Sequence, residues 1–441
     1  MVGQLTSLDT TFFRASEPDQ DASMSIGAVA IMDGPLPHFD QFKSFLAQRI
    51  QDVPRCMQVL RTGWTADPEF DLTQHIQRVA LPQPGDDGEL FQVIAHALER
   101  PVALNRPPWE CWIIEGLQDD RWAILMKIHH CMADEISPAH LLTRLCDDAD
   151  TDADMFATDV AVKSGSPSQP PPRSWAETVV SAYATVFKTA ARVLSWPAIW
   201  MSPAESVATR RRYGTVRVPR ADVEAVSRKF GVTANDVALA VITEGFRSVL
   251  LERGEEPRAD SLRTVAKADD RISALLPYLP VEHDDPVAQL RAVHGRLSQH
   301  AQRPATNGFD TPFILAAKAF QTLTRLPQRF VTLATNVAGP RRRLQLMGQR
   351  VDQLLPIPPT AQQLSTGVAA LSYGDELVFG ITAEYEAGSD MEQLIAGIER
   401  GMARLVALSQ DSVLLFTKNR RKRTVHPSRG RVSAHPALAR R

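Results

Sequence analysis

The chain lacks the cysteine patterns that define metal-stabilised or disulfide-stabilised domains. Its 441 residues include only four cysteines, and no two of them form a CxxC pair: Cys56, Cys111, Cys131 and Cys146. Zinc frameworks and small secreted scaffolds both rely on closely spaced cysteines. We therefore expect neither class, and a reducing, cytoplasmic setting fits the sequence best.

Long hydrophobic runs are missing as well. No segment reaches the ~18 uninterrupted apolar residues that a membrane span needs. Asp9 and Arg14 interrupt the N-terminal stretch, so no signal peptide is expected. In the most apolar candidate, residues 174–201, polar residues recur at three- and four-residue spacing. This spacing predicts an amphipathic helix, which either packs on the protein body or lies on a lipid surface through Trp196 and Trp200.

Neither the charge nor the glycine pattern points to nucleotides. The net charge is −2, and charged residues make up 23% of the chain. No general attraction to nucleic acid or anionic lipid is expected from such a balance. No Walker-type or Rossmann glycine motif occurs. We expect no specific nucleic-acid partner, and the partners must be inferred from local motifs.

Length and composition predict two domains. The chain is about three times as long as an average domain of ~150 residues. An acidic and then Ser- and Pro-rich stretch after residue 147 indicates a linker. We expect an N-terminal domain at 1–150, a linker with the amphipathic crossover helix at 151–212, a C-terminal domain at 213–410, and a basic, disordered tail at 411–441.

Apolar runs separated by turn residues indicate an α/β (α+β) fold. CWIIEGL at 111–117 and WAILMKI at 122–128 have the pattern of a hairpin. GVAALSY at 367–373 and ELVFGIT at 376–382 have the same pattern around Gly-Asp. The first hairpin ends at a pair of histidines.

Two capping boxes are predicted at helix starts. Ser389 with Glu392, and Thr233 with Asp236, have the three-residue spacing at which a hydroxyl and an acid satisfy backbone N–H groups reciprocally.

The histidine pair lies in KIHHCMADEIS, residues 127–137. A metal site would need three or four ligands within reach, whereas adjacent strand residues such as His129 and His130 point to opposite faces. A Cys131 nucleophile would need a base in contact with it, a geometry that sequence neighbours seldom reach. A purely structural role for the histidines, with Asp134 accepting loop N–H bonds, stays open.

The other interpretation is one histidine acting as general base, without a metal. A neutral imidazole can take the proton of an alcohol as the oxygen attacks an acyl carbon, and its ordinary pKa of about 6.5 suits neutral pH. Asp134 would then fix the loop by pairing with an arginine elsewhere in the chain.

Ordered landmarks along nearly the whole chain resemble one known family. They are LTSLDTTFFRASEPDQDASMSIGAVAIMDG, RPPWECWIIEGL, KIHHCMADEIS, VTANDVALAVITEGFR, RISALLPYLPVEHDDP and ATNVAGPRRRL. With these landmarks the chain resembles the bacterial wax ester synthase/acyl-CoA:diacylglycerol acyltransferases of the mycobacterial type. The resemblance implies two similar domains with the fold of CoA-dependent acyltransferases and an active-site channel between them.

The resemblance also implies the chemistry. The expected reaction transfers a long-chain acyl group from acyl-CoA, as co-substrate and without other cofactors, to diacylglycerol or a long-chain alcohol. The resemblance also implies that the protein acts at a membrane or lipid-droplet surface. The implied base is His130. The supporting residues would be His129, Asp134, Asn235 and Asp236, and Asn336 and Gly339 would form an oxyanion or channel loop.

Simpler roles stay open for several of these groups. Asp236 could serve only as a helix cap, and the loop with Asn336 and Gly339 could be a plain turn. CoA phosphates would need cations, which either 341–343 or 210–212 could supply, although both arginine runs also fit a solvated surface.

Glu135 departs from the family pattern, which has glycine after the aspartate of HHxxxD. Glycine there would permit a positive φ or a close backbone approach. A glutamate adds an anion near His130, where it could raise the pKa of the base or repel CoA phosphates. This departure leads to an alternative expectation, a catalytically impaired member that binds acyl-CoA or lipid, or regulates a paralogue.

Overall fold

A computed structural model of the protein describes residues 25–61, 63–132, 138–147, 210–265, 278–301, 329–335, 339–340, 342–358 and 366–410. The chain divides into two units, Met1–Ser409 and Gln410–Arg441, and the elements discussed below belong to the first. The expected crossover helix at 174–201 and the expected tail at 411–441 lie outside the described residues.

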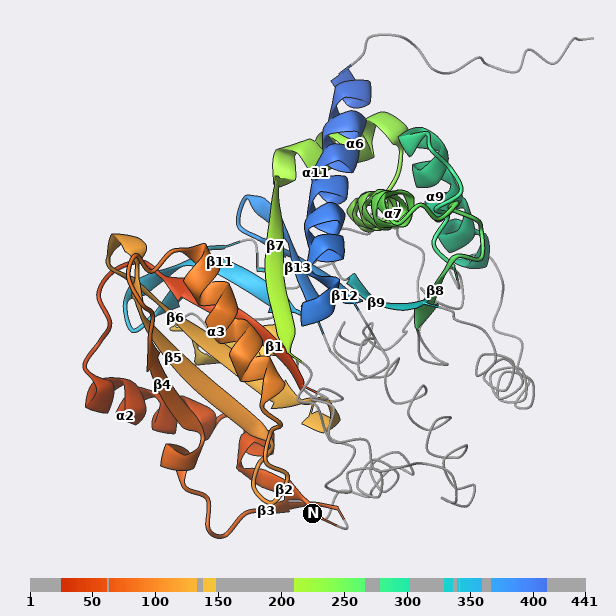
Figure 1. Ribbon diagram of the computed structural model, residues 1–441. Coiled ribbons are helices and arrows are strands. Elements are labelled where there is room, and N and C mark those ends of the chain that lie inside the picture. Colours follow the sequence, from red (N-terminus) through yellow and green to blue (C-terminus); the bar gives the residue numbers. More distant parts are fainter. Residues whose placement is uncertain are drawn as a thin grey trace, which may run out of the picture. The chain divides into compact units, whose positions relative to one another are not determined.

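Helices and strands are interspersed along the chain (Figure 1). The strands are β1 Ser25–Met32, β2 Gln58–Leu60, β3 Trp64–Ala66, β4 Ile76–Ala80, β5 Trp109–Leu117, β6 Arg121–His129, β7 Arg211–Pro219, β8 Leu262–Val265, β9 Arg329–Thr335, β10 Gln345–Leu346, β11 Gln349–Ile357, β12 Thr366–Tyr373 and β13 Glu376–Glu384. The α-helices are α2 Phe39–Ile50, α3 Asp87–Glu99, α4 Pro138–Leu145, α6 Arg220–Phe230, α7 Ala234–Glu252, α9 Pro286–Ala301 and α11 Gly388–Gln410.

Both predicted hairpins are present. β5 and β6 pair antiparallel across a turn at Gln118–Asp120, in which Asp119 and Asp120 have positive φ values. Aspartate tolerates this left-handed conformation better than most residues because its short side chain bonds locally. β12 and β13 pair antiparallel around Gly374, which also has a positive φ.

The strands form two mixed sheets that repeat one topology. The first sheet has the order β10-β11-β1-β6-β5-β4 and the second the order β7-β13-β12-β9-β8. In the first sheet β1 is antiparallel to β6, β6 forms the hairpin with β5, and β5 is parallel to β4. In the second sheet β7, β13, β12 and β9 repeat these relations in the same chain order. The expectation of two similar α/β halves is confirmed in the order and direction of their strands.

One hairpin crosses from the second half of the chain to the first sheet. β10 and β11 lie between β9 and β12 in sequence, yet β11 pairs antiparallel with β1, so that Gly27 is opposite Ile357. β11 also contacts β12 and β13 of the second sheet. The strand therefore joins the two sheets directly.

Three buried clusters follow from the alternation of side chains along the strands. One cluster lies between the first sheet and α2 and α4, and another lies between the second sheet and α6, α7, α9 and α11. The third joins the sheets: it combines Val29 and Ile31 of β1 with α3, Tyr213 of β7, Leu355 of β11 and Val378 of β13.

Of the two capping boxes predicted at helix starts, the structure contains one and not the other. The Thr233–Asp236 capping box at α7 is confirmed, with both reciprocal bonds formed. The capping box at Ser389 is wrong, because α11 already begins at Gly388 and Ser389 lies inside the helix. The carboxylate of Asp390 instead accepts a hydrogen bond from Arg253 Nε at 2.8 Å. Glu392, the acid that the spacing assigned to the cap, lies 3.9 Å from Arg212 Nη1 instead.

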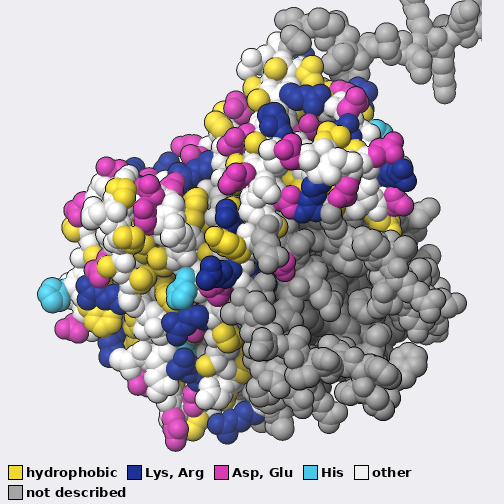
Figure 2. Space-filling view, viewed as in Figure 1, with side chains coloured by type: hydrophobic (Ala, Val, Ile, Leu, Met, Phe, Trp, Pro, Cys, Tyr) yellow, Lys and Arg dark blue, Asp and Glu magenta, His cyan; other side chains and the backbone are white. Residues whose placement is uncertain are grey.

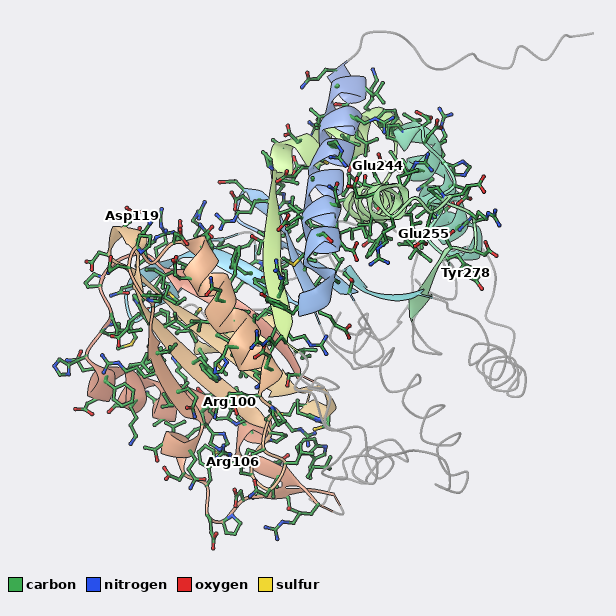
Figure 3. The ribbon with its side chains drawn as sticks, viewed as in Figure 1. Arg100, Arg106, Asp119, Glu244, Glu255 and Tyr278 are labelled. Carbon is green, nitrogen blue, oxygen red and sulfur yellow. The ribbon has the colours of Figure 1, made fainter. Side chains whose placement is uncertain are left out.

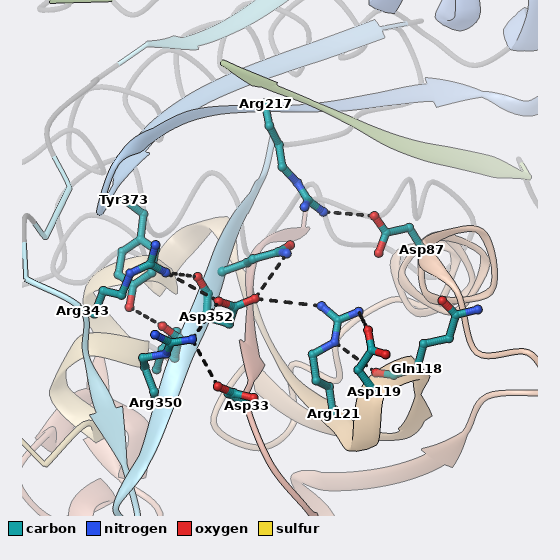
Figure 4. A network of polar contacts seen from close by, with 12 residues as sticks. Asp33, Asp87, Gln118, Asp119, Arg121, Arg217, Arg343, Arg350, Asp352 and Tyr373 are labelled. Carbon is teal, nitrogen blue, oxygen red and sulfur yellow. Dashed lines mark hydrogen bonds and ion pairs between the residues drawn. The ribbon is translucent and has the colours of Figure 1, made fainter. Parts of the chain in front are cut away.

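Polar networks tie the elements together. Asp352 on β11 lies near three guanidinium groups, those of Arg121, Arg343 and Arg350 (Figure 4). Among the helices, Glu244 of α7, labelled in Figure 3, is one such centre. It accepts hydrogen bonds from Gln289 of α9 and Arg404 of α11, both at 3.1 Å.

Acidic and basic side chains are interspersed on the face drawn in Figure 2, with hydrophobic side chains scattered among them. Among the described residues, we find no helix both long and apolar enough to cross a membrane.

Candidate active site

The first hairpin brings the histidine motif to the end of a central strand. β6 ends at His129, and His130 opens a short 3-10 turn that runs to Met132. The side chain of His130, and all of Asp134 and Glu135, lie outside the part of the chain that the structure describes. The site is therefore characterised through the residues that hold its backbone.

His129 is buried at the end of β6. Its Nδ1 accepts a hydrogen bond from the backbone N–H of Cys131 at 3.4 Å and lies 3.1 Å from Cys131 Sγ. Burial, aided by the nearby Lys127 cation, lowers the pKa of His129 to about 3. This imidazole is neutral at physiological pH and a weak base, which suits a structural role.

The contact between His129 and Cys131 corrects one expectation from the sequence. Sequence neighbours were expected to reach such a contact only seldom, but the 3-10 turn brings the thiol to the imidazole. None of the four cysteines forms a disulfide, and all four are buried. A Cys131 nucleophile still lacks support from His129, because an imidazole with a pKa of about 3 cannot hold the thiol proton at neutral pH.

Lys127 lies two residues before His129 on the same face of β6 and is fully buried. Its Nζ donates a hydrogen bond to the carbonyl of Ala97 at 2.7 Å and another to that of Arg100, at the C-terminal end of α3. It also lies 3.4 Å from Oε2 of Glu110, its direct partner in the β5–β6 register. Desolvation lowers the pKa of Lys127, and the Glu110 carboxylate opposes that shift.

Glu110 is anchored in turn by Trp112, whose indole N–H donates to Oε2 at 2.9 Å. The histidine-bearing strand is thus fixed to β5 and to α3 through buried charges. Neither Lys127 nor Glu110 was expected from the sequence to support the site. The register of the predicted hairpin carried the signal, because it places the two side chains opposite each other.

The adjacent Trp109 is a core residue. Its ring is stacked on His75, with 4.5 Å between the centroids, and its indole N–H donates to the carbonyl of Cys56 at 2.8 Å. The backbone N–H of His129 donates to the carbonyl of Pro108 at 2.9 Å. The PPWE landmark therefore supports the strand end that carries the histidines.

The Asn-Asp landmark lies at the first turn of α7. Asp236 Oδ2 accepts hydrogen bonds from the backbone N–H of Thr233 and from His294 Nδ1 of α9, both at 2.8 Å. The side-chain oxygen of Asn235 is buried and has no hydrogen-bond partner within the described residues. Asp236 therefore caps α7 and ties it to α9, and Asn235 keeps an unused acceptor.

Gly339 lies against β12. A Cβ atom at this position would collide with the backbone carbonyl of Ser372. The N–H of Gly374 donates to the carbonyl of Pro340 at 3.3 Å. The loop therefore needs glycine for close backbone approach. Asn336, the other residue expected in this loop, lies outside the described residues.

The two arginine runs are partly engaged. Arg343 Nη1 donates to the carbonyl of Asp352 at 2.8 Å. The guanidinium groups of Arg210 and Arg212 lie 5.7 and 4.7 Å from the ring centroid of Tyr385. Arg341 lies outside the described residues, and binding of CoA phosphates by either run stays a prediction.

Two buried hydroxyl groups, one of them opposite His129, were not expected. Ser25 is directly opposite His129 in the β1–β6 pair, and Thr382 lies on β13 opposite Tyr213. Neither hydroxyl oxygen has a hydrogen-bond partner in the described ranges. The same ranges hold no cluster of three or more potential metal ligands.

Comparison with solved structures identifies the fold. A wax ester synthase/diacylglycerol acyltransferase from Marinobacter aquaeolei VT8 matches with a TM-score of 0.63 and 21% identity, covering 92% of this chain and 100% of that one. The first condensation domain of the calcium-dependent antibiotic synthetase matches with a TM-score of 0.51 and 15% identity, covering 93% of this chain and 96% of that one. The two-domain, condensation-like acyltransferase fold is thereby confirmed.

Relatives of higher identity come from Mycobacterium tuberculosis. One, named "Putative diacyglycerol O-acyltransferase", is 60% identical over 454 residues, which cover 100% of both chains. Another, named "Probable diacyglycerol O-acyltransferase tgs1", is 45% identical and covers 93% of this chain and 97% of its own.

Family models match both halves. The wax ester synthase/diacylglycerol acyltransferase catalytic domain matches residues 5–238, and the WS/DGAT C-terminal domain matches residues 269–405. The resemblance seen in the sequence motifs is confirmed: the chain belongs to the wax ester synthase/diacylglycerol acyltransferase family.

Proposed function

We propose that this protein transfers a long-chain acyl group from acyl-CoA to diacylglycerol, a fatty alcohol or both, with His130 as the general base. The observation that carries the proposal is the HHxxxD motif at the end of β6 in a chain of this family. Relatives named diacylglycerol O-acyltransferase support the choice of acceptor. An O-acyltransferase of Acinetobacter baylyi, 25% identical over 76% of the chain, belongs to the same set.

The proposed step is a direct transfer without an acyl-enzyme. His130 takes the proton of the acceptor hydroxyl as its oxygen attacks the thioester carbon. The resulting tetrahedral oxyanion collapses, the carbon–sulfur bond breaks, and the CoA thiolate takes a proton from His130. The products are an ester and CoA with a free thiol.

The residues around His130 support this role by fixing its backbone. His129 is neutral and held by the turn, and Lys127 anchors the strand to α3. A general base gains efficiency when such supports hold it near the productive geometry. Asn235, Asp236, Asn336 and Gly339 are proposed to support the site from the second half of the chain.

No cofactor or metal is part of the proposal, and acyl-CoA is only a co-substrate. We also place the reaction at a membrane or lipid-droplet surface, because both proposed acceptors are insoluble lipids. Activity that is insensitive to EDTA would agree with a reaction that needs no metal. Flotation of the protein with phosphatidylcholine vesicles containing dioleoylglycerol would agree with a reaction at a lipid surface. Inactivation by EDTA with recovery on adding a divalent ion would refute the proposal that no metal is needed.

The test is an assay of purified protein with labelled palmitoyl-CoA and either dioleoylglycerol or hexadecanol. His130→Ala should lower the rate by about 10²–10⁴-fold, the range of general-base catalysis. His96→Ala is the matched control, since His96 is exposed on α3. Ester formation by His130→Ala at the wild-type rate would refute the assignment of the base.

Glu135 favours a second candidate, a member with an impaired site that binds acyl-CoA or lipid, or regulates a paralogue. This candidate predicts that wild-type protein binds palmitoyl-CoA with little turnover and that Glu135→Gly gains turnover. Equal turnover of the two proteins would remove the reason for it.

A further inference from the structure

Two hydroxyl groups are buried without partners, one on each sheet, and one of them, that of Ser25, is opposite the last residue of β6. Ser25 is 0% exposed and Thr382 is 1% exposed, and neither Oγ of Ser25 nor Oγ1 of Thr382 has a hydrogen-bond partner among the described residues. Burying a hydroxyl without a partner is unfavourable, and buried polar groups in native proteins are nearly always bonded. Two such hydroxyls, one of them beside the histidine motif, therefore call for a ligand that completes their bonding.

Ser25 lies beside the histidine motif. It is directly opposite His129, and side chains of opposite residues in antiparallel strands lie on one face with Cβ atoms about 4.5–5.5 Å apart. His129 Nδ1 already accepts the Cys131 N–H. The alternation along β1 puts Ser25 on the face of Val29 and Ile31, which pack in the cluster joining the two sheets.

Thr382 lies on the corresponding face of the second sheet. Its partner across β7 is Tyr213, whose hydroxyl donates to the carbonyl of Pro356 on β11 at 3.0 Å. Its partner across β12 is Gly367, which has no side chain to cover the threonine hydroxyl. Thr382 therefore faces the same cluster as Ser25, from the opposite sheet.

The C-terminal end of α3 contacts the strands on which the partners of Ser25 and Thr382 lie. Lys127, two residues before His129, donates to the carbonyls of Ala97 and Arg100. Glu99 Oε1 accepts a hydrogen bond at 2.8 Å from the backbone N–H of Arg211, which is two residues before Tyr213. The last turn of α3 thus contacts one residue two positions from His129 and another two positions from Tyr213.

The chemistry of the two groups selects an uncharged oxygen ligand. Both are neutral donors, and the nearby ammonium of Lys127 is engaged with two carbonyls and Glu110. Ester carbonyls match such donors. Diacylglycerol offers two ester carbonyls beside its reacting hydroxyl, whereas a fatty alcohol offers none.

We propose that the hydroxyls of Ser25 and Thr382 bind the ester carbonyls of a diacylglycerol acceptor and make the site select diacylglycerol over fatty alcohols. This inference rests on the proposed acyl transfer and adds its acceptor preference. A site with buried donors discriminates against a ligand that leaves them unpaired.

The test compares acceptors in Ser25→Ala, Thr382→Val and the double variant. The ratio of kcat/KM for dioleoylglycerol to kcat/KM for hexadecanol should fall about tenfold for each hydroxyl removed. The KM for palmitoyl-CoA should not change. Thr243→Val and Ser248→Ala are matched controls, because their hydroxyls bond to backbone carbonyls within α7, and their ratios should stay at the wild-type value.

Two results would overturn the inference: an unchanged ratio in the double variant, or equal losses with both acceptors. Thermal melting excludes misfolding, since replacing an unpartnered hydroxyl should not lower Tm. If Ser25→Ala fails to fold, Thr382→Val decides alone.

Binding of labelled dioleoylglycerol in detergent micelles separates this inference from the proposed function. Wild-type protein that binds dioleoylglycerol about 100-fold more tightly than the double variant, but makes no ester, would refute the transfer and keep the subsite. Ester formation with equal binding by wild type and variant would refute only the subsite.

Discussion

The ammonium group of Lys127 lies 3.4 Å from the carboxylate of Glu110, and both side chains are almost completely shielded from solvent. They are opposite each other on β6 and β5, and the lysine also caps the carbonyls at the end of α3. A buried pair of this kind holds three elements in one geometry two residues before His129.

Removing one partner of this pair should destabilise the folded protein. We expect Glu110→Gln or Lys127→Met to lower the free energy of unfolding by about 3–5 kcal/mol, because each leaves a buried charge or its hydrogen-bonding groups uncompensated. Urea denaturation of the two single variants and the double variant would measure the coupling. Glu256→Gln is the control: its pair with Arg258 is exposed, so a change below about 1 kcal/mol is expected. Equal effects at both pairs would contradict this account.

His129 should make the protein less stable in acid. Its pKa is about 3 in the folded state against about 6.5 when unfolded. Between these values the unfolded chain binds more protons, so stability is fully present above pH 6.5 and is lost as the pH falls toward 3. The maximal slope from one such group is about 1.4 kcal/mol per pH unit. Urea denaturation of wild type and His129→Gln at pH 7.5 and 5.0 would test this, and parallel pH dependences would refute it.

The carboxylate of Asp236 should contribute more than a helix cap. It accepts bonds from Thr233 and from His294. Asp236→Asn should therefore lower the free energy of unfolding by about 2–3 kcal/mol, against about 1 kcal/mol for Thr233→Val, which removes only the cap. Equal losses in denaturation would show that the contact with His294 adds nothing.

Gly339 should not tolerate a methyl group. Gly339→Ala places a Cβ against the carbonyl of Ser372, and we expect a loss of about 1–3 kcal/mol in unfolding free energy, the usual cost of overpacking, together with reduced acyl transfer. Gly295→Ala in α9 is the control, since its Cβ would meet no atom within 4 Å and alanine favours the helix by about 0.5–1 kcal/mol. A stable and fully active Gly339→Ala protein would contradict the close approach.

Local features of the fold could be predicted from the sequence. Both hairpins and the Thr233 cap depend on residues that are close in the chain, and their turn chemistry is explicit. The buried contact of His129 with Cys131 could not be predicted, because it depends on a 3-10 turn that no residue pattern announces.

Some features of the site could likewise be predicted from the sequence, and others could not. The position of the histidines at a strand end followed from the hairpin, whereas the neighbours of that end come from distant parts of the chain. Ser25 lies about 100 residues before His129, and the pairing of β1 with β11 joins positions 330 residues apart, as 357 − 27 shows for Gly27 and Ile357. Such pairings leave no local signal, since any apolar strand could fill the place.

The crossing of β11 also sets when the chain can fold during synthesis. Because β1 lacks its β11 neighbour until residue 357 has left the ribosome, the first sheet stays open along that strand while more than three quarters of the protein is made. An unpaired apolar edge is a target for wrong pairing and for chaperones. The nascent N-terminal half should therefore wait, partly assembled, for a strand encoded near the end of the gene.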